Sequence, residues 1–296
     1  MLKSIVIVTL LVLDPGASET VYQEELGYRT VAQGEVSAAL AGAWDAAATE
    51  GREWVLMAPD SPNEVYLRFV ESSGVGNYEP MKTLGWNAVE LQVEDPDALE
   101  QSLDPARFEI IGPPAFLTGG ENIRAMQVLG PDRELLYLTR VIDPTQSTFN
   151  IGTAEAWVDR VFIMVLGTAD LAATTRFYGE GLGQSVAGPF PYRVTVLSRA
   201  WGKPQDTMYD LSIAQLEGPF LIEIDEYPTE APLRSAAEGD LPHGPAIVTF
   251  EVDDLGAYEA RLGRDATPLA VAPFLGRPAL FVTGPSGERI GLVEAE

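Results

Sequence analysis

The residue types that most often carry out chemistry are scarce in this chain. The sequence has no Cys and a single His, His243. Thiolate nucleophiles, disulfides and Cys-zinc sites are therefore excluded, as is any site that needs two imidazoles from one chain. There is no Gly-Lys-Ser/Thr phosphate loop and no Gly-x-Ser-x-Gly elbow, and Gly74-Val75-Gly76 lacks the third glycine of a dinucleotide fingerprint. Carboxylates, arginines and aromatic side chains remain as groups that could bind or protonate a ligand.

The chain is strongly acidic. Its 296 residues include 19 Lys and Arg against 44 Asp and Glu, which gives a net charge of −25. This balance argues against nucleic acid and an anionic membrane surface as partners, because both attract cationic proteins. Hydrophobic residues make up 46% of the chain, enough for large cores. The negative charge has two possible explanations: it keeps the protein soluble, as in a salty cytoplasm, or it attracts a cationic ligand. We expect a cytoplasmic protein.

An apolar run near the N-terminus has two interpretations. Residues 4–13 follow Lys3 and precede Asp14-Pro15-Gly16, so they could form a short signal peptide. The run is, however, rich in β-branched residues, is bounded by turn residues and is too short to span a bilayer. These features favour a buried strand.

Three short segments recur in order along the chain, which indicates an internal duplication of roughly half its length. Segments 21–28, 93–99 and 130–134 correspond to 177–184, 252–258 and 284–288. Each half contains two units of one strand, one helix and three further strands. We expect first strands at 3–10, 86–93, 160–166 and 246–252, and helices at 17–26, 96–103, 170–181 and 254–262. Ser18 and Gly27 are the expected ends of the first helix.

Three segments of the second half resemble one protein family. Residues 170–183 (DLAATTRFYGEGLG), 250–255 (FEVDDL) and 284–294 (GPSGERIGLVE) are similar to sequence patterns of the vicinal oxygen chelate superfamily, which includes glyoxalase I, bleomycin-resistance proteins and extradiol dioxygenases. The resemblance implies an α+β fold of four βαβββ modules. These would form two tandem domains, residues 1–142 and 157–296, joined by a linker at 143–156, each with a curved mixed sheet around a cavity.

The same resemblance identifies the positions at which metal-binding relatives place their ligands, usually His and Glu. In this chain the positions are occupied by Ser4, Arg68, Ala88 and Tyr137 in the first half and by Arg160, Glu223, Ile247 and Gly291 in the second. Only Glu223 is a good ligand, and an arginine repels a divalent cation. We therefore expect no metal and no cofactor. His243 lies in a loop before the fourth module, where a solvated side chain is expected.

The resemblance also indicates which residues line the two cavities. Because strand residues two apart share a face, Glu90 joins Ala88, and we expect an Arg68–Glu90–Tyr137 cluster in the first domain. The second domain would hold Arg160 and Glu223, with Thr249 nearby. Each Arg–Glu pair either replaces a lost metal as a neutral ion pair or binds a ligand. With two charges of each sign in the cavities, the negative surplus would lie outside, which favours the solubility explanation.

Aromatic residues give a further indication of function, as core residues or as the wall of a ligand site. They are Trp44, Trp54, Tyr66, Trp86, Tyr192, Trp201 and Tyr209. We predict metal-independent binding of a small, partly aromatic organic molecule, as the resistance proteins of the family sequester their ligands. The alternative is a lyase, isomerase or dioxygenase of the glyoxalase/dioxygenase class acting on a small oxygenated substrate, with Glu223 or Glu90 as base. A third possibility is a structural module with filled cavities. Monomer and homodimer remain open.

Overall fold

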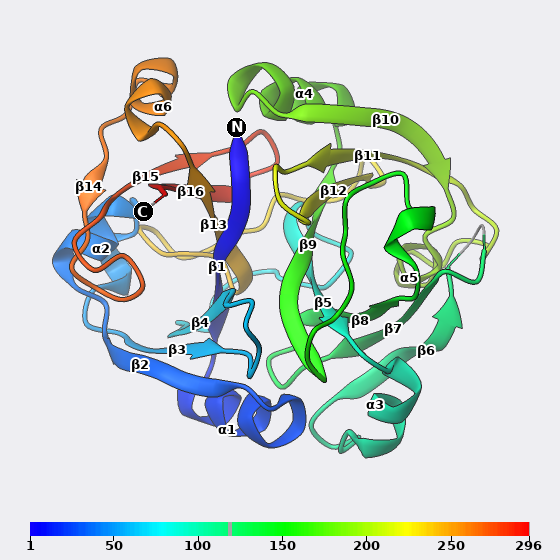
Figure 1. Cartoon of the computed structure of the whole chain (residues 1–296). Coiled ribbons are helices and arrows are strands. Elements are labelled where there is room, and N and C mark those ends of the chain that lie inside the picture. The colour runs from blue at the N-terminus through cyan, green and yellow to red at the C-terminus, as the bar shows by residue number, and fades with distance from the viewer. Residues whose placement is uncertain (118–119, 296) are drawn as a thin grey trace.

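The computed structural model describes residues 1–117 and 120–295 and contains two mixed sheets of eight strands each (Figure 1). In spatial order, sheet A consists of β14 (Thr267–Pro268), β15 (Pro278–Thr283), β16 (Arg289–Glu294), β13 (Gly244–Val252), β1 (Leu2–Val12), β4 (Tyr66–Glu71), β3 (Glu53–Ala58) and β2 (Arg29–Glu35). Sheet B consists of β10 (Ser185–Tyr192), β11 (Tyr209–Gln215), β12 (Leu221–Glu226), β9 (Val158–Thr168), β5 (Gly85–Val93), β8 (Leu135–Val141), β7 (Ile123–Leu129) and β6 (Glu109–Phe116). The predicted α+β fold of four βαβββ modules is confirmed.

One helix follows the first strand of each module. These helices are α1 (Pro15–Leu26), α3 (Pro96–Ser102), α4 (Leu171–Arg176) and α6 (Leu255–Leu262). Each begins after an aspartate whose carboxylate accepts a backbone N–H at the first turn; the four are Asp14, Asp95, Asp170 and Asp254. The predicted cap Ser18 is wrong, because α1 begins earlier, at Pro15. Gly27 ends α1 with φ at 70°, as predicted.

Shorter helical segments lie in the connections. They are α2 (Ala38–Ala43), α5 (Thr195–Ala200), the 3₁₀ turns Ala47–Thr49 and Pro144–Gln146, and a π-helical turn at Phe177–Gly181 that continues α4. Among the described residues, no helix is long and apolar enough to cross a membrane. The apolar run at 4–13 forms most of β1, as the strand interpretation predicted.

The modules do not pair as the sequence halves suggested. The first and fourth modules share sheet A through β1 and β13, whereas the second and third share sheet B through β5 and β9. In Figure 1 the blue and red ends of the chain accordingly lie together, beside a separate cyan-to-yellow sheet. The expectation that residues 1–142 and 157–296 each build their own sheet is therefore corrected.

The physical reason for this pairing is that every module presents the same kind of edge. Within each module the strand order places the first strand outermost, next to the fourth strand. An unpaired strand edge must find a partner, and any other module offers an equivalent one. The repeat therefore determines how many modules exist, whereas the connections between modules and the packing of the sheets select which edges meet.

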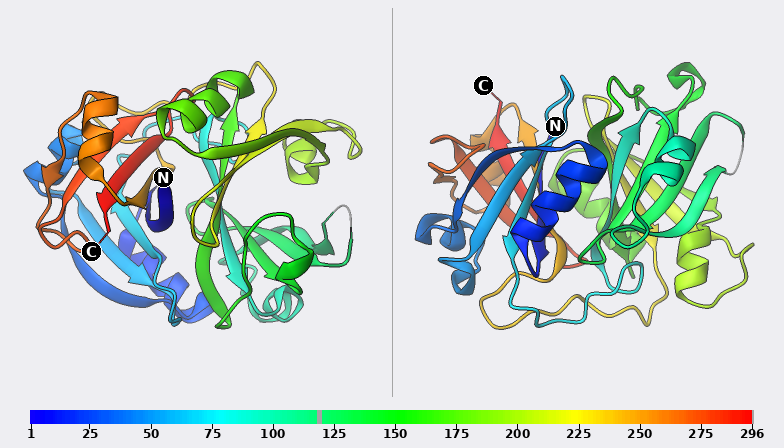
Figure 2. Two further views of the ribbon diagram at one scale, coloured as in Figure 1. Left: turned by 45° about the horizontal axis from the view of Figure 1, so that its top comes forward. Right: turned by 90° about the horizontal axis from the view of Figure 1, so that it is seen from below.

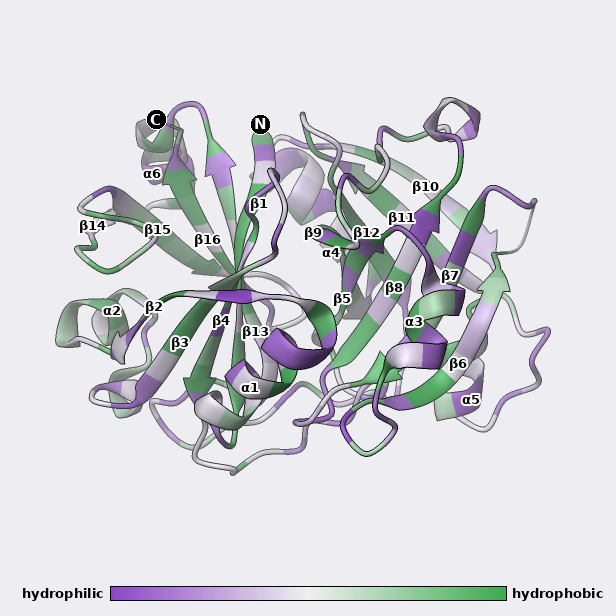
Figure 3. Ribbon diagram, turned by 60° about the horizontal axis from the view of Figure 1, so that its bottom comes forward, coloured by the Kyte–Doolittle hydropathy of each residue, from purple (hydrophilic) through white to green (hydrophobic). Residues whose placement is uncertain are grey.

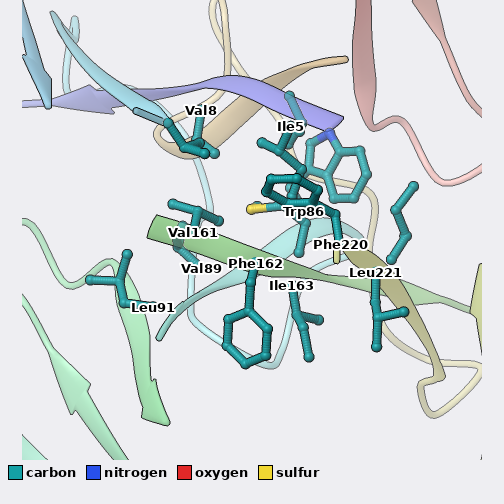
Figure 4. Packing of buried hydrophobic residues seen from close by; sticks show 14 of the residues in the cluster. Ile5, Val8, Trp86, Val89, Leu91, Val161, Phe162, Ile163, Phe220 and Leu221 are labelled. Atoms are coloured by element: carbon teal, nitrogen blue, oxygen red, sulfur yellow. The ribbon is translucent and has the colours of Figure 1, made fainter. Parts of the chain in front are cut away.

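The two sheets pack against each other through their convex faces. Figure 4 shows Ile5 and Val8 of β1 facing Trp86 and Val89 of β5, with Val161 of β9 beside them. The Trp86 indole also donates a hydrogen bond across this interface to the Arg289 carbonyl at 2.8 Å. Figure 2 shows the two curved sheets side by side, with the dark-blue strand β1 in the middle of sheet A. Figure 3 shows apolar residues concentrated in the strands. The concave faces, called cup A and cup B after their sheets, are therefore directed away from each other.

A repeated tyrosine–glutamate contact joins the sheets. Tyr22 of α1 donates its hydroxyl to Glu134, in the turn before β8, at 2.9 Å. The same Glu134 accepts the Asp132 N–H at 2.9 Å. In the repeat, the buried Tyr178 hydroxyl lies near Glu288, which accepts the Ser286 N–H at 2.8 Å. Each contact connects a helix of one sheet to a turn of the other.

Candidate functional site

Cup B contains a cavity of about 310 Å³. Its walls are mainly apolar and come from β5, β7, β8, β9, β11 and β12, from the segment around β10 and α5, and from the chain between β8 and β9. The lining residues are Glu90, Leu117, Ile123, Gln127, Tyr137, Thr139, Val141, Ser147, Phe149, Ile151, Phe162, Ile163, Phe190, Tyr192, Arg193, Val194, Thr195, Val196, Leu211, Ile213, Leu221 and Glu223. A cavity of this size and character suits a small organic molecule.

Strand alternation and register bring the polar residues of the cavity together. Glu90 of β5 pairs in register with Tyr137 of β8 on one side and with Ile163 of β9 on the other. Leu221 of β12 pairs with Ile163, so Glu223 lies two residues further along the same face. The two glutamates therefore project into cup B from strands on either side of β9.

The chain between β8 and β9 forms one wall of the cavity. It contributes Ser147, Phe149 and Ile151 to the lining. The side-chain amide of Gln92, inside cup B, donates to the Ile151 and Gly152 carbonyls at 3.1 and 3.0 Å. The predicted linker thus connects two modules of one sheet and is fixed by hydrogen bonds to it.

Burial raises the pKa of both cavity glutamates. Glu90 is 5% exposed, and burial together with the nearby Glu223 raises its pKa to about 8, although its Oε1 accepts the Thr139 hydroxyl at 2.6 Å. Burial raises the pKa of Glu223 to about 7. Both carboxyl groups therefore exchange protons near neutral pH.

A third carboxyl group lies beside Glu223. Asp225 shares the same face of β12, is fully buried, and has a pKa well above its usual range because of burial and the proximity of Glu223 and Glu90. Among the described residues, no group donates a hydrogen bond to either of its oxygens. A proton held between Asp225 and Glu223 supplies the missing donor, since two ionised carboxylates this close would repel each other.

Three of the six predicted ligand-binding residues gather in this cavity: Glu90, Tyr137 and Glu223. The predicted Arg68–Glu90–Tyr137 cluster is wrong, because Arg68 lies on β4 of sheet A. The predicted Arg160–Glu223 pair is also wrong. Arg160 is on β9 but forms an ion pair with Asp159 at 2.8 Å. A sequence alignment alone could not reveal the different pairing of modules that separates Arg68 from Glu90.

Cup A, in contrast, is filled by its own side chains. Arg68 is 1% exposed and its guanidinium lies over the rings of Trp44, Trp54 and Phe274, at 5.9, 5.3 and 5.7 Å from their centroids. It also donates a hydrogen bond to the Ala272 carbonyl. No acidic side chain among the described residues forms an ion pair with it, so the expected neutralising glutamate is replaced by aromatic rings.

The remaining predicted residue, Thr249, is buried in cup A. It pairs in register with Gly291, and a Cβ on that glycine would lie 2.5 Å from the Thr249 hydroxyl oxygen. A space of only about 10 Å³ remains beside Trp44 and Ile247. Cup A therefore offers no room for a ligand, and Thr249 and Arg68 act as packing residues there.

Several cavity residues did not emerge from the sequence. Thr139 lines the cavity two positions beyond Tyr137, and Asp225 lies next to Glu223 two positions beyond it, so strand alternation could have identified both. Ser147, Phe149 and Ile151 carry no such signal, because a connecting segment has no fixed periodicity. Of the seven aromatic candidates, Tyr192 lines the cavity, whereas Trp44 and Trp54 enclose Arg68 and Trp86 packs between the sheets.

The expected solvation of His243 is also corrected. Its side chain is only 17% exposed, and its Nε2 lies 4.0 Å from the Asp132 carboxylate. The ring also packs beside Tyr78. His243 thus belongs to the contact between the sheets and lies outside the cavity lining.

In the described part of the chain, cup B lacks the three grouped ligands that are typical of a transition-metal site. Glu90 and Glu223 are two carboxylates, but the register neighbours of Glu90 are Tyr137 and Ile163. Within residues 1–117 and 120–295, no three His, Asp, Glu or Cys side chains are grouped so that they could hold a metal ion. Transition-metal sites need at least three converging protein ligands of this kind.

Solved structures with a similar fold include two that match nearly the whole chain. Glyoxalase I from Zea mays aligns with a TM-score of 0.63 and 14% identity over 98% of this chain and 92% of that chain. A putative dioxygenase from Bacillus subtilis subsp. subtilis str. 168 aligns with a TM-score of 0.63 and 13% identity over 99% of this chain and 85% of that chain. No family model and no curated protein matches the sequence.

These similarities define the class of the protein by its fold. The fold is that of glyoxalase I from Zea mays and of the putative dioxygenase from Bacillus subtilis. The glyoxalase I match extends over nearly the whole chain, and the resemblance predicted from the three sequence segments is confirmed at the level of the fold. Function must be inferred from the site, because this scaffold supports many activities.

Proposed function

We propose that cup B binds a small, partly aromatic organic molecule without a metal, and that the protein acts in the cytoplasm as a monomer or homodimer. The observation that carries this proposal is the cavity of about 310 Å³ with apolar walls and a few convergent polar groups. The filled state of cup A supports it further, because of the two cups only cup B keeps an apolar cavity large enough for a ligand. A purely structural module would have both cups filled, whereas here only cup A is filled.

Filling the cavity is expected to abolish binding. Ile213 lies on β11 with its side chain in the cavity lining, so Ile213→Trp places a large ring where the ligand's apolar body would lie. Compounds that raise the melting temperature of the wild-type protein should bind this variant at least about tenfold more weakly. The measurement is a thermal-shift screen of aromatic compounds followed by calorimetric titration, with elemental analysis of the protein to test metal independence.

The matched control is Val31→Trp, which adds the same ring at an exposed position of β2. It should bind the same compounds as the wild type. Undiminished binding by a folded Ile213→Trp variant would place the ligand outside cup B, and a near-stoichiometric metal in the purified protein would contradict the proposed metal independence.

An enzyme of the glyoxalase/dioxygenase class is the alternative, and the state of Glu90 favours it. A carboxyl group with a pKa raised to about 8 can accept and return a proton near neutral pH. If this alternative holds, carbonyl compounds that bind cup B should exchange the hydrogen beside the carbonyl for deuterium in D₂O, as followed by NMR. Glu90→Gln should retain binding and lose the exchange. Exchange at the same rate in Glu90→Gln would exclude Glu90 as the base.

A further inference from the structure

The charged groups around the Glu90 carboxyl are acidic. Glu223 and Asp225 face it from β12, and no basic side chain contributes to the pKa of Glu90 or Glu223. The Tyr137 hydroxyl on β8 is a further titratable group near Glu90, and the Tyr227 hydroxyl after β12 lies near Asp225 and Glu223. Strand β9 contributes the apolar Ile163. The balance of charges expected from the sequence is therefore absent, because Arg68 is held in cup A and Arg160 by Asp159.

One basic residue is part of the described cavity lining. This residue, Arg193, follows β10 and is exposed to solvent. Tyr192 precedes it with its side chain partly buried. A guanidinium in contact with water keeps its hydration, so it does not neutralise carboxyl groups at the floor of the cavity.

We propose that the ligand of cup B carries a protonated amine, which binds between Glu90 and Glu223 while its aromatic body occupies the apolar walls. This inference rests on the proposed function and specifies its ligand class. Asp225 adds to the acidity of this region, because it is a fully buried carboxyl group close to Glu223 on the same face of β12. A cation bound between Glu90 and Glu223 would therefore also offset the charge of this neighbouring group.

Physical chemistry favours a cation over the other ligand charges. A buried carboxylate is costly unless a proton or a cation compensates its charge. Without a bound cation, protons neutralise the two glutamates. An ammonium group, which has three hydrogen-bond donors, can replace these protons. An anionic ligand would meet the two buried carboxyl groups, and Arg193, the basic residue of the described lining, is exposed to solvent. The acidity of the whole chain, with its net charge of −25, also raises the encounter rate of a cation.

The proposal predicts that binding releases protons. The pKa values of about 8 for Glu90 and about 7 for Glu223 mean that both groups hold protons for much of the time at neutral pH. An ammonium group binds the ionised forms, so it lowers both pKa values and displaces protons. Its affinity should therefore rise with pH, by about tenfold or more between pH 6 and 8.

The test compares three probes that share one ring: naphthylethylamine, naphthylethanol and naphthylacetate. Calorimetric titration at pH 6, 7 and 8, in two buffers with different ionisation enthalpies, measures both the affinity and the number of protons released. We expect the amine to bind at least about tenfold more tightly than the alcohol at pH 8 and to release protons. The acetate should bind more weakly than the alcohol.

Conservative variants identify the groups responsible. Glu90→Gln and Glu223→Gln preserve side-chain volume and should each weaken amine binding by about tenfold while changing alcohol binding little. Glu226→Gln is the matched control, because Glu226 lies on the same strand, borders a groove on the other face of β12, and lies outside the cavity lining. It should bind the amine as the wild type does.

The outcomes separate this inference from the proposed function. Equal or tighter binding of the alcohol, with an affinity that falls as pH rises, would overturn the amine proposal and leave the aromatic site intact. The amine proposal would also be overturned if Glu226→Gln weakened amine binding as much as Glu223→Gln does. The effect would then come from the overall charge of the protein. Failure of all three probes to bind the folded protein would contradict the proposed function itself.

Discussion

Arg68→Ala is expected to cost about 3–5 kcal/mol of unfolding free energy, the range observed when a large core side chain is truncated. Arg68 is one of the largest fully buried side chains, and removing it leaves a cavity bounded by Trp44, Trp54 and Phe274. The variant also loses the hydrogen bond to the Ala272 carbonyl, which fixes the segment before β15. Chemical denaturation followed by tryptophan fluorescence measures the loss, because two of the affected rings are tryptophans.

Arg68→Met distinguishes volume from charge. Burial lowers the pKa of Arg68 to about 9, which shows that its charge is poorly solvated where it lies. An apolar side chain of similar length should therefore be tolerated within about 1 kcal/mol, as replacements of buried charged groups often are. Arg264→Ala, an exposed arginine paired with Asp45, is the control and should cost no more than about 0.5 kcal/mol. If Arg68→Met is as unstable as Arg68→Ala, the interactions of the cation with the rings hold cup A closed.

The free energy of unfolding is expected to fall as pH rises from about 5 to 8. Burial raises the pKa of Glu134 and of Glu288 to about 7, against an unfolded value of 4.5. Between these values the folded state binds more protons than the unfolded state, so stability is greatest below pH 4.5 and is lost as pH rises through the folded pKa. Each group can account for up to about 3 kcal/mol, since one pKa unit corresponds to about 1.4 kcal/mol.

Glu134→Gln provides the measurement of this effect. Its side-chain oxygen can still accept the Tyr22 hydroxyl, but its amide nitrogen cannot accept the Asp132 N–H that Glu134 accepts at 2.9 Å. We expect the variant to be less stable than the wild type at pH 5, by about 1–2 kcal/mol, and equally or more stable at pH 8. Urea denaturation at each pH gives the two curves, with Glu226→Gln as a control for net charge. Parallel curves for wild type and Glu134→Gln would show that Glu134 does not titrate in this range.

Much of the fold could be predicted from local features. The duplicated segments indicated four modules, and the aspartates before each helix recur at Asp14, Asp95, Asp170 and Asp254 as repeated N-caps. These features depend on residues a few positions apart, which the sequence displays directly. The first helix shows the limit of such reasoning, because both Asp14 and Ser18 are good caps and only the structure selects the earlier one.

The candidate site was predictable in part for the same reason. Glu90, Tyr137 and Glu223 lie on strands whose inward faces follow from alternation, and the structure brings them to one cavity. Arg68 and Thr249 follow the same alternation but lie on sheet A, so the rule that identified them could not reveal which cup they would occupy. Ser147 and Phe149 come from an irregular connection and became cavity residues only when it folded across cup B.

The sequence alone thus determined the number and type of modules, the positions that face inward and the scarcity of metal ligands. Tertiary structure decided which module edges meet, because all four edges are alike and a strand edge pairs with any equivalent edge that the connections allow. That choice separated Arg68 from Glu90, surrounded the arginine with aromatic rings, and left the cavity glutamates without a cation. The sequence suggested that two arginines and two glutamates balance each other in the cavities. In the structure the glutamates share cup B without the arginines, and this separation defines the candidate site.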